Sequence, residues 1–506
     1  KDLHDIADKL DFEEIEKRRG YDLGFITHYI IEKKINPLRW YELDGELLNN
    51  SLEFGGIDMN LDVDFCIKLN KVKEINEINF QPRTLAYDIE VDELKLGAGE
   101  ILMISLVGEN FKKVLTWKKS PNPPKFVEFV KDEAELLEKF VEHVRKFSPD
   151  FLVGYFSDGF DLPYIKARAE KLKVNLSLGL DNSQPKFTRG ISVTAKIDGI
   201  VHVDILKFIR TAYSQYMQSE TLSLNEVAKE FLGDTKKEFK FKHSSEIEEN
   251  DWNNYYEYNL HDSVLTLGLF EKMWADLLEF SRVMQEPVFN VSRNGMSKNV
   301  ESYILHHLEK FNEIPEKRAT YDEIGKRRGR EKYEGAFVLE PTPGLYEDIA
   351  IFDFTSMHAS IIVSFNISKS TLLDKKEKNS YESPEMEISG KKEKFYFSKE
   401  IGFFPSLLKE IVELRKKYKK ELKSKPDMIK KARSNAFKLL ANAYYGYLGF
   451  FGARYYSVEA AASTLAFVRK FNKETIKKVQ DAGYKVIFSD TDSVGFLMNK
   501  KSETEI

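Results

Sequence analysis

In the first half of the chain, segments with the apolar pattern of β-strands alternate with segments with the apolar pattern of helices. Apolar runs predict strands at RTLAYDIEV (83–91), ILMISLVG (101–108), DFLVG (150–154) and GIVHVDILKFI (199–209). Helical periods cover 133–147, 161–172 and 251–274. Strands that alternate with helices are typical of an α/β domain. Residues 1–45 read as charged helices, and DVDFCIKLNKV (62–72) predicts a small β layer.

The second half of the chain predicts a different arrangement. Helical periods cover 291–311, a segment that begins at Ser356, and two basic stretches within 403–452 that are broken at KSKPD (423–427). The run IAIF (349–352) predicts a strand, and VIFSDTDSVGF (486–496) has the apolar arms and polar tip of a β-hairpin. Residues 371–395 have no clear period and predict a loop or an exposed hairpin.

Composition narrows the class of protein. The 506 residues, 31% charged and 42% hydrophobic, suit about three or four globular domains. No stretch approaches the roughly 20 consecutive apolar residues that span a bilayer. Cys66 is the only cysteine, which favours a reducing intracellular compartment. The net charge of -5 does not predict a nucleic-acid binder, but residues 411–440 carry eleven Lys and Arg against three acids, a basic face suited to phosphate.

Acidic residues interrupt the predicted elements of the α/β domain at several points. Asp88 and Glu90 are two apart in a strand, so both carboxylates lie on one face. Asp161 begins a helix, and Tyr258 and Asp262 are neighbours on one face of another. Four such acids suit two Mg²⁺ or Mn²⁺ ions that cleave a phosphodiester. Each acid taken singly is more typical of a surface or capping residue.

A second set of acids lies in the second half of the chain. Asp490 and Asp492 stand at the tip of the predicted hairpin, where their spacing brings both carboxylates to one side. Alone, this motif is more typical of an acidic turn. Asp353 ends a strand directly before a helix N-terminus, where free backbone N–H groups attract anions. That position suits a metal ion whose other ligands are triphosphate oxygens.

The two basic helices each carry polar residues on one face. Arg415 and Lys419 are four apart on the first helix. Lys438 and Asn442 are four apart on the second, and Tyr445 follows three residues later. Such a helix pair can grip a triphosphate, with Tyr445 available to stack on a base. A solvated, charged helix pair is the common alternative.

Six short motifs occur in a fixed order along the chain. The sequence contains DIE (88–90), YFSDGFD (155–161), YNLHD (258–262), DFTSMHAS (353–360), KLLANAYYG (438–446) and FSDTDS (488–493). Together they resemble the three exonuclease and three polymerase motifs of the family-B DNA polymerases, most closely the archaeal ones. The resemblance covers nearly the whole chain, and the order of six motifs is far more specific than any one of them.

The resemblance implies a role for each candidate residue. The polymerase metals would be held by Asp353 and Asp492, with Asp490 beside them. The nucleotide site would comprise Ser356, Met357, His358, Arg415, Lys419, Lys438, Asn442 and Tyr445. The exonuclease metals would be held by Asp88, Glu90, Asp161 and Asp262, while Tyr258 would position the water. Two Mg²⁺ ions per site are expected, with Mn²⁺ as the alternative.

The implied activity is template-directed DNA polymerisation with 3′–5′ proofreading. The substrates would be primer–template DNA and deoxynucleoside triphosphates, and a sliding clamp is a further candidate partner. The protein would act in the cytoplasm on the nucleoid. Two residues depart from the family pattern: His358 replaces a tyrosine that packs against the nucleotide sugar, and Phe156 replaces an asparagine of the second exonuclease motif. An exonuclease with an idle polymerase site and a non-enzymatic DNA-binding scaffold are the alternative functions.

The resemblance also predicts the domain organisation. We expect a partial N-terminal domain (1–77), a ribonuclease-H-like exonuclease (78–275), a helical return segment (276–320), a palm with an antiparallel sheet in two parts (321–402 and 451–506) and helical fingers (403–450). Residues upstream of Lys1 are expected to be missing. The thumb is expected to be absent from this chain. A small subunit would supply it together with the rest of the palm, and the alternative is that this chain is a truncated piece of a longer polypeptide.

Overall fold

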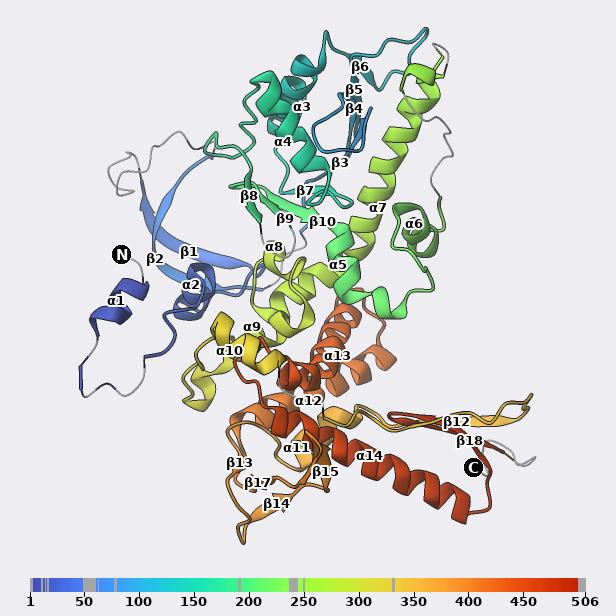
Figure 1. The fold of residues 1–506 in the computed structure, drawn as a ribbon. Helices are drawn as coiled ribbons and strands as arrows, with labels where there is room; N and C mark the ends of the chain where they lie inside the picture. Colours follow the sequence, from blue (N-terminus) through green and yellow to red (C-terminus); the bar gives the residue numbers. More distant parts are fainter. Residues whose placement is uncertain are drawn as a thin grey trace. The chain divides into compact units, whose positions relative to one another are not determined.

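The chain forms two compact units, and each combines helices with β-sheet (Figure 1). The computed structural model describes residues 3–10, 12, 13, 15, 18–48, 61, 63–76, 80–189, 193–235, 244–248, 251–329 and 333–498. We call Asn36–Arg282 with Glu286–Asn294 the six-stranded unit, and Lys1–Ile35 with Val283–Gln285 and Gly295–Ile506 the four-stranded unit, after their main sheets. The predicted α/β multidomain fold is confirmed. Among the described residues, no helix is both long enough and apolar enough to cross a membrane.

The six-stranded unit is built on a mixed sheet with the strand order β10-β7-β3-β4-β5-β6. Its central strand β3 pairs in parallel with β7 and antiparallel with β4. The elements of this unit are β1 (Tyr41–Leu47), β2 (Ile67–Glu74), β3 (Thr84–Val91), β4 (Ile101–Gly108), β5 (Phe111–Thr116), β6 (Val127–Phe129), α3 (Glu133–Phe147), β7 (Phe151–Gly154), α4 (Asp161–Leu172), β8 (Lys186–Arg189), β9 (Val193–Lys196), β10 (Val201–Asp204), α5 (Ile205–Ala212), η2 (Ser214–Tyr216), α6 (Leu224–Leu232), η3 (Ser244–Glu246), α7 (Trp252–Met284) and α8 (Val288–Val291).

Helices cover both faces of the six-stranded sheet, which explains the continuous apolar run of β4. One face packs against α3 and α4 in a core that includes Leu106, Phe140 and Ile165. The other face packs against the start of α7, where Val107 meets Tyr256. β3 lies within this sheet, and α4 and α7 pack on its two faces. These three elements carry the predicted acids.

The structure corrects two predictions in this part of the chain. The segment 199–209 is not one strand, because β10 ends at Asp204 and helix α5 begins directly after it. The Asp204 carboxylate accepts the backbone N–H of Leu206 at 3.1 Å and so caps the helix. Residues 1–45 are helical only in α1 (Leu3–Lys9) and α2 (Phe25–Lys33), since 41–47 form β1, which pairs with β2.

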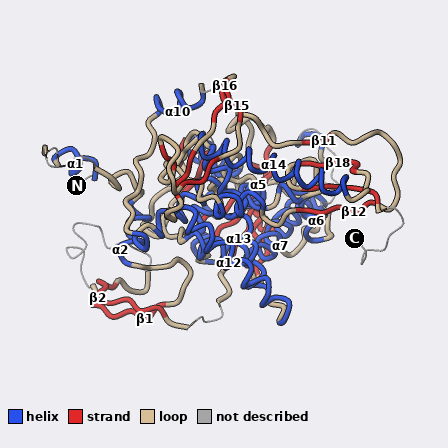
Figure 2. The backbone as a smooth tube through the Cα atoms, turned by 90° about the horizontal axis from the view of Figure 1, so that it is seen from below, coloured by secondary structure: helices blue, strands red, loops and turns tan. Residues whose placement is uncertain are grey.

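The four-stranded unit contains an antiparallel sheet with the order β11-β18-β19-β12, and α14 packs along it (Figure 2). The predicted hairpin is confirmed as β18 and β19, and the predicted helix break lies between α12 and α13. The remaining elements are α9 (Met296–His307), η4 (Glu309–Phe311), α10 (Tyr321–Arg328), β11 (Val338–Leu339), β12 (Ile349–Asp353), α11 (Met357–Ser364), β13 (Leu372–Leu373), β14 (Ser380–Glu382), β15 (Met386–Ile388), β16 (Lys391–Glu393), β17 (Tyr396–Ser398), α12 (Phe403–Ser424), α13 (Met428–Gly449), α14 (Val458–Asp481), β18 (Val486–Asp490) and β19 (Ser493–Leu497).

A buried ion pair fastens α4 to α3 in the six-stranded unit. The Arg168 guanidinium donates to both carboxylate oxygens of Glu133, through Nε at 2.7 Å and through Nη2. The two side chains are only 4% and 5% exposed. Glu133 also accepts the backbone N–H of Ile101 at 2.8 Å, which links the helix pair to β4. Removing one partner would leave the other charge buried and uncompensated.

We therefore expect Arg168→Ala to lower the free energy of unfolding by about 3–5 kcal/mol. Urea unfolding followed by circular dichroism measures this change. The control Lys166→Ala lies on the same helix and breaks an exposed pair with Glu170, whose side chains are 39% and 64% exposed. Its cost should stay below about 0.5 kcal/mol. Equal costs for the two variants would contradict a structural role for the buried pair.

Candidate active sites

Three predicted acids meet in the six-stranded unit. Asp88 and Glu90 lie two residues apart on β3, and Asp262 lies on α7. One carboxylate oxygen from each lies within 4.8 Å of the others. Asp262 is buried, while Asp88 and Glu90 are half-buried. Three oxygen donors at this separation are a suitable ligand set for a hard divalent cation such as Mg²⁺ or Mn²⁺.

Asp161 stands at the first position of α4, as predicted, and is only 4% exposed. It is outside the group of three close acids but within electrostatic range of it. Burial, together with the negative charges of Asp204 and Glu90, raises the pKa of Asp161 to about 7. A carboxylate with such neighbours ionises readily only when a cation offsets the accumulated charge.

Two residues that the sequence did not single out orient these acids from α7. The Tyr255 hydroxyl donates to Glu90 at 2.8 Å, and the Asn259 side-chain amide donates to Asp88 at 2.8 Å. Helical spacing places both on the same side of α7 as Asp262. That periodicity was the available signal, although it does not reveal which strand the helix covers. Tyr258 is half-buried, with its ring centroid 6.0 Å from that of Tyr255.

A second group of predicted residues meets in the four-stranded unit. β12 and β19 pair so that Asp353 lies opposite Ser493, and the backbone N–H of Phe354 donates to the carbonyl of Asp492 at 2.8 Å. Burial and the nearby charges of Asp353 and Asp490 raise the pKa of Asp492. Asp492 at the hairpin tip and Asp353 at the end of β12 therefore lie close together.

A cavity of about 420 Å³ opens beside this carboxylate pair. Most of the predicted nucleotide-site residues line it: Ser356, Met357, His358, Arg415, Lys419, Lys438 and Asn442, together with Asp353 and Asp492. Arg415 donates to the Ser356 hydroxyl at 2.9 Å. One cavity thus combines two acids with three basic side chains from α12 and α13, which is a suitable environment for a polyphosphate that carries a metal ion.

Two predicted residues lie outside the lining of this cavity. Asp490 is exposed at the end of β18, and its Oδ1 accepts the Thr491 hydroxyl at 2.8 Å. Tyr445 is half-buried and packs against His358, with a ring-centroid distance of 4.7 Å. Burial lowers the pKa of His358, so its imidazole is neutral at pH 7. Tyr445 therefore contacts His358, which lines the cavity, and does not line the cavity itself.

Comparisons with known proteins assign two regions of the chain to one family. Residues 287–506 match DNA polymerase family B, and residues 16–227 match the exonuclease domain of DNA polymerase family B. The chain belongs to DNA polymerase family B. The two matched regions contain five of the six motifs, and YNLHD (258–262), which carries Asp262, lies between them.

The similar proteins include DNA polymerases of archaea. DNA polymerase 1 of Pyrococcus abyssi is 32% identical over 481 residues, covering 94% of this chain and 56% of the relative. The DNA polymerase of Thermococcus sp. (strain 9oN-7) is 33% identical over 483 residues, with 94% and 56% covered. The structure of the family B DNA polymerase from Pyrobaculum calidifontis matches with a TM-score of 0.76 and 27% identity, covering 100% of this chain and 63% of that one. The chain spans about half the length of its curated relatives.

The raised pKa of Asp161 has a measurable consequence for stability. Between its ordinary value of 3.8 and about 7, the folded protein holds a proton that the unfolded chain releases. The free energy of unfolding of the metal-free protein therefore falls as pH rises through this window. Asp161→Asn removes the titration, so at pH 8 it should raise the free energy of unfolding by up to about 4 kcal/mol, at about 1.4 kcal/mol per pKa unit.

Thermal unfolding in EDTA at pH 5 and pH 8 checks this prediction, with a larger gain in Tm expected at pH 8. The control is Asp181→Asn. Hydrogen bonds from Ser183 hold the pKa of this exposed carboxyl below its usual range, so neutralising it should give no gain. A gain for Asp161→Asn that is the same at both pH values would contradict the assignment.

Proposed function

We propose that the chain carries a template-directed DNA polymerase site and a separate 3′–5′ proofreading exonuclease site. The observation that carries the proposal is the cavity in which Asp353 and Asp492 face Arg415, Lys419 and Lys438. Acids that bind metal and bases that bind phosphate have to converge in a nucleotidyltransferase. Membership of family B supports the same reaction class.

At the polymerase site, Asp353 and Asp492 would hold two Mg²⁺ ions, with Mn²⁺ as the alternative. Bound there, the ions would supply Lewis acidity to the primer 3′-hydroxyl and to the α-phosphate of the nucleotide. Arg415, Lys419 and Lys438 would bind the triphosphate. His358 lies in the cavity, and it would meet the nucleotide from the side where Tyr445 supports it.

At the exonuclease site, Asp88, Glu90, Asp161 and Asp262 would hold the metal ions that promote hydrolysis of the terminal phosphodiester. Tyr258 would orient the attacking water. Tyr255 and Asn259 would fix the carboxylates of Glu90 and Asp88 through the two hydrogen bonds from α7. Loss of such supporting hydrogen bonds commonly weakens metal binding about 10- to 100-fold.

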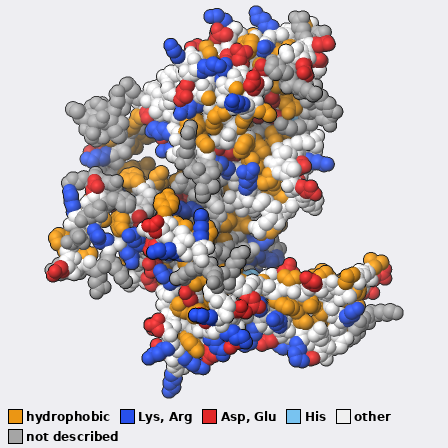
Figure 3. All heavy atoms as spheres, viewed as in Figure 1, with side chains coloured by type: hydrophobic (Ala, Val, Ile, Leu, Met, Phe, Trp, Pro, Cys, Tyr) orange, Lys and Arg blue, Asp and Glu red, His pale blue; other side chains and the backbone are white. Residues whose placement is uncertain are grey.

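We further propose that a second, smaller polypeptide completes the palm and supplies the thumb. Strand β12 lies at one edge of the four-stranded sheet, and none of the described residues pairs with its other side. On this strand Ile351 is 63% and Phe352 is 54% exposed, and Figure 3 shows hydrophobic side chains gathered over this part of the surface. An apolar edge strand readily accepts a further strand.

A second apolar feature lies beside this edge. Phe352 and Phe354 line a cavity of about 460 Å³ with Val479, Tyr484 and Phe496, between the sheet and α14. Side chains from the second polypeptide would fill it. Without that polypeptide the polymerase site would be idle, which favours the exonuclease as the second candidate function of the isolated chain. The assembled enzyme would act on chromosomal DNA in the cytoplasm, with a sliding clamp as a further partner.

Single substitutions separate the two proposed activities. Asp353→Ala should reduce nucleotide incorporation by roughly 10²- to 10³-fold or more and leave degradation intact, because it removes a metal ligand from one site only. Asp88→Ala should have the opposite effect. A labelled primer–template incubated with and without deoxynucleotides measures both activities. The control Asp374→Ala changes an exposed acid outside the cavity. If both active-site variants retained both activities, the assignments would be wrong.

The second polypeptide can be tested separately. The isolated chain should extend a primer poorly, and addition of a protein fraction that contains the missing palm strands and thumb should restore processive synthesis. Phe352→Asp should weaken that restoration at least tenfold, because it places a charge on the apolar edge. The exonuclease activity, which does not use Asp353, should not change. Processive synthesis by the purified chain alone, or a coding sequence that continues past Ile506 into those strands, would contradict the proposal.

A further inference from the structure

A buried asparagine on α14 bonds to the hairpin that carries Asp490 and Asp492. Asn472 is fully buried, and its side-chain amide donates to the backbone carbonyl of Thr491 at 3.0 Å. Thr491 is the residue between the two acids. A buried amide without partners is costly, so a polar side chain persists at such a position only when its hydrogen bonds are made. Asn472 makes them to the turn of the hairpin.

The amide of Asn472 matches two different groups of this turn. Its Nδ2 donates to the Thr491 carbonyl, while its Oδ1 faces the Ser489 hydroxyl at 3.0 Å. That hydroxyl also lies 2.7 Å from the carbonyl of Ser493, so it can donate to either oxygen. A leucine of the same shape would supply neither group, and an aspartate would place an acceptor against the Thr491 carbonyl. Among side chains of this shape, only an amide satisfies both positions.

The residue that this amide holds has a strained backbone. Thr491 has φ +53°, and no other β-branched residue in the described part of the chain has a positive φ. The left-handed region is strongly disfavoured for such side chains, which remain there only when surrounding contacts hold them. The Thr491 N–H donates to the Phe337 carbonyl at 3.0 Å, and the Thr491 carbonyl accepts from Asn472. The strained residue is therefore bonded at both of its backbone groups.

The bond from Asn472 also constrains Asp492. The Thr491 carbonyl belongs to the peptide bond that joins Thr491 to Asp492, and because this bond is planar, a contact that fixes the carbonyl fixes the Asp492 N–H as well. On its other side, the Asp492 carbonyl accepts the N–H of Phe354 at 2.8 Å. Both peptide groups that flank the Cα of Asp492 are thus held, and the direction of its side chain follows from them.

The same helix ties down the segment that supports the other end of the turn. Arg469, three residues before Asn472, donates to the carbonyls of Glu334 and Gly335, each at 2.7 Å. This segment leads to Phe337, whose carbonyl accepts the N–H at the hairpin tip. Two polar residues almost one helical turn apart therefore anchor the tip, one directly and one through the preceding segment.

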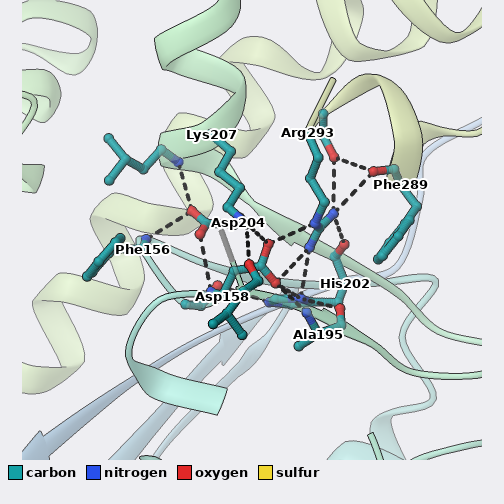
Figure 4. Close-up of polar contacts among 12 residues, drawn as sticks. Phe156, Asp158, Ala195, His202, Asp204, Lys207, Phe289 and Arg293 are labelled. Carbon is teal, nitrogen blue, oxygen red and sulfur yellow. Dashed lines mark hydrogen bonds and ion pairs between the residues drawn. The ribbon is translucent and has the colours of Figure 1, made fainter. Parts of the chain in front are cut away.

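The six-stranded unit holds the turn that precedes Asp161 in a comparable way. The buried carboxylate of Asp204 accepts the N–H of Phe156 at 3.0 Å and the N–H of Asp158 at 3.2 Å (Figure 4). Phe156, like Thr491, has a left-handed backbone angle. In both units a buried polar side chain thus bonds the backbone of a strained turn that lies close in sequence to a proposed metal ligand.

We propose that Asn472 is a positioning residue of the polymerase site, which holds the hairpin turn so that Asp492 presents its carboxylate to a divalent cation. The inference rests on the proposed polymerase function and adds a residue that acts through the backbone of the hairpin. Asn472 lies outside the lining of the cavity that contains Asp353 and Asp492. Removing its amide therefore weakens the binding of the cation and leaves the basic side chains of the cavity in place.

The test measures how nucleotide binding depends on the cation. The full chain is mixed with fluorophore-labelled α,β-methylene dATP, and Mn²⁺ is titrated to give the half-saturating Mn²⁺ concentration. Asn472→Leu keeps the shape of the side chain and removes the amide, so it should raise this concentration about 10- to 100-fold. Ser489→Ala removes one partner of the amide and should give a smaller rise. At saturating Mn²⁺, both variants should bind the nucleotide as the wild type does.

The matched control is Thr464→Val on the same helix. It removes a buried hydroxyl that donates to the Ala460 carbonyl at 2.9 Å, within the helix itself. The half-saturating Mn²⁺ concentration should therefore equal that of the wild type. Thermal unfolding shows whether each variant folds. If Asn472→Leu does not fold, Ser489→Ala decides from the hairpin side: a raised concentration supports the proposal, and an unchanged one overturns it.

Three results with folded Asn472→Leu would overturn the proposal. These are a half-saturating Mn²⁺ concentration equal to that of the wild type, a rise that Thr464→Val shares, and an equal loss of nucleotide affinity at saturating Mn²⁺, which would show a general loosening of the cavity. Asp353→Ala tests the polymerase site itself. If the wild-type chain bound the nucleotide without a cation, and Asp353→Ala bound it equally well, the proposed polymerase function would fail whatever the result for Asn472.

Discussion

Mutual repulsion between carboxylates that the fold holds close together is the constraint on which both sites depend. In the six-stranded unit, β3 and α7 bring Asp88, Glu90 and Asp262 within 4.8 Å. In the four-stranded unit, strand pairing brings the backbone of Asp353 and Asp492 together, and burial together with the charge of Asp353 raises the pKa of Asp492. Packing alone does not favour either arrangement, because carboxylates of like charge repel one another when they are buried together. The rest of each unit has to be stable enough to hold them until a cation binds.

Some of the residues with a left-handed backbone angle lie at or beside the same sites. Thr491, between Asp490 and Asp492, has φ +53°, Ser356 has φ +54°, and Phe156 has φ +62°. Each angle costs on the order of 1–3 kcal/mol and is held by specific hydrogen bonds. Thr491 donates its N–H to Phe337 and accepts from the Asn472 amide, whereas the Ser356 hydroxyl accepts from Arg415. At Thr491 the strained angle stands between two aspartates, while the flanking strands β18 and β19 remain regular.

Local signals in the sequence predicted much of the fold. The helix 133–147 was predictable to the residue because Asp132 caps it, with its side chain accepting the Glu135 N–H at 3.0 Å, and because its apolar period is strong. The hairpin of 486–496 and the helix break at 423–427 were equally local. The division of 199–209 was not, because it depends on Asp204 serving as a cap. Tyr255 and Asn259 escaped prediction because their partners lie more than 160 residues away and only the packing of α7 on β3 joins them.

The two sites differ in how far the surrounding fold completes them. In the proposed exonuclease site, Asp88 and Glu90 lie on β3, while Asp161 and Asp262 lie on α4 and α7, the helices that cover the two faces of that sheet. The polymerase acids lie on a sheet that ends at β12, where apolar side chains face solvent. Exposed apolar residues on an edge strand are typical of a surface that pairs with further structure. The proposed hydrolysis site is therefore enclosed by elements of its own unit, whereas the sheet of the proposed nucleotide-addition site ends in an apolar edge strand.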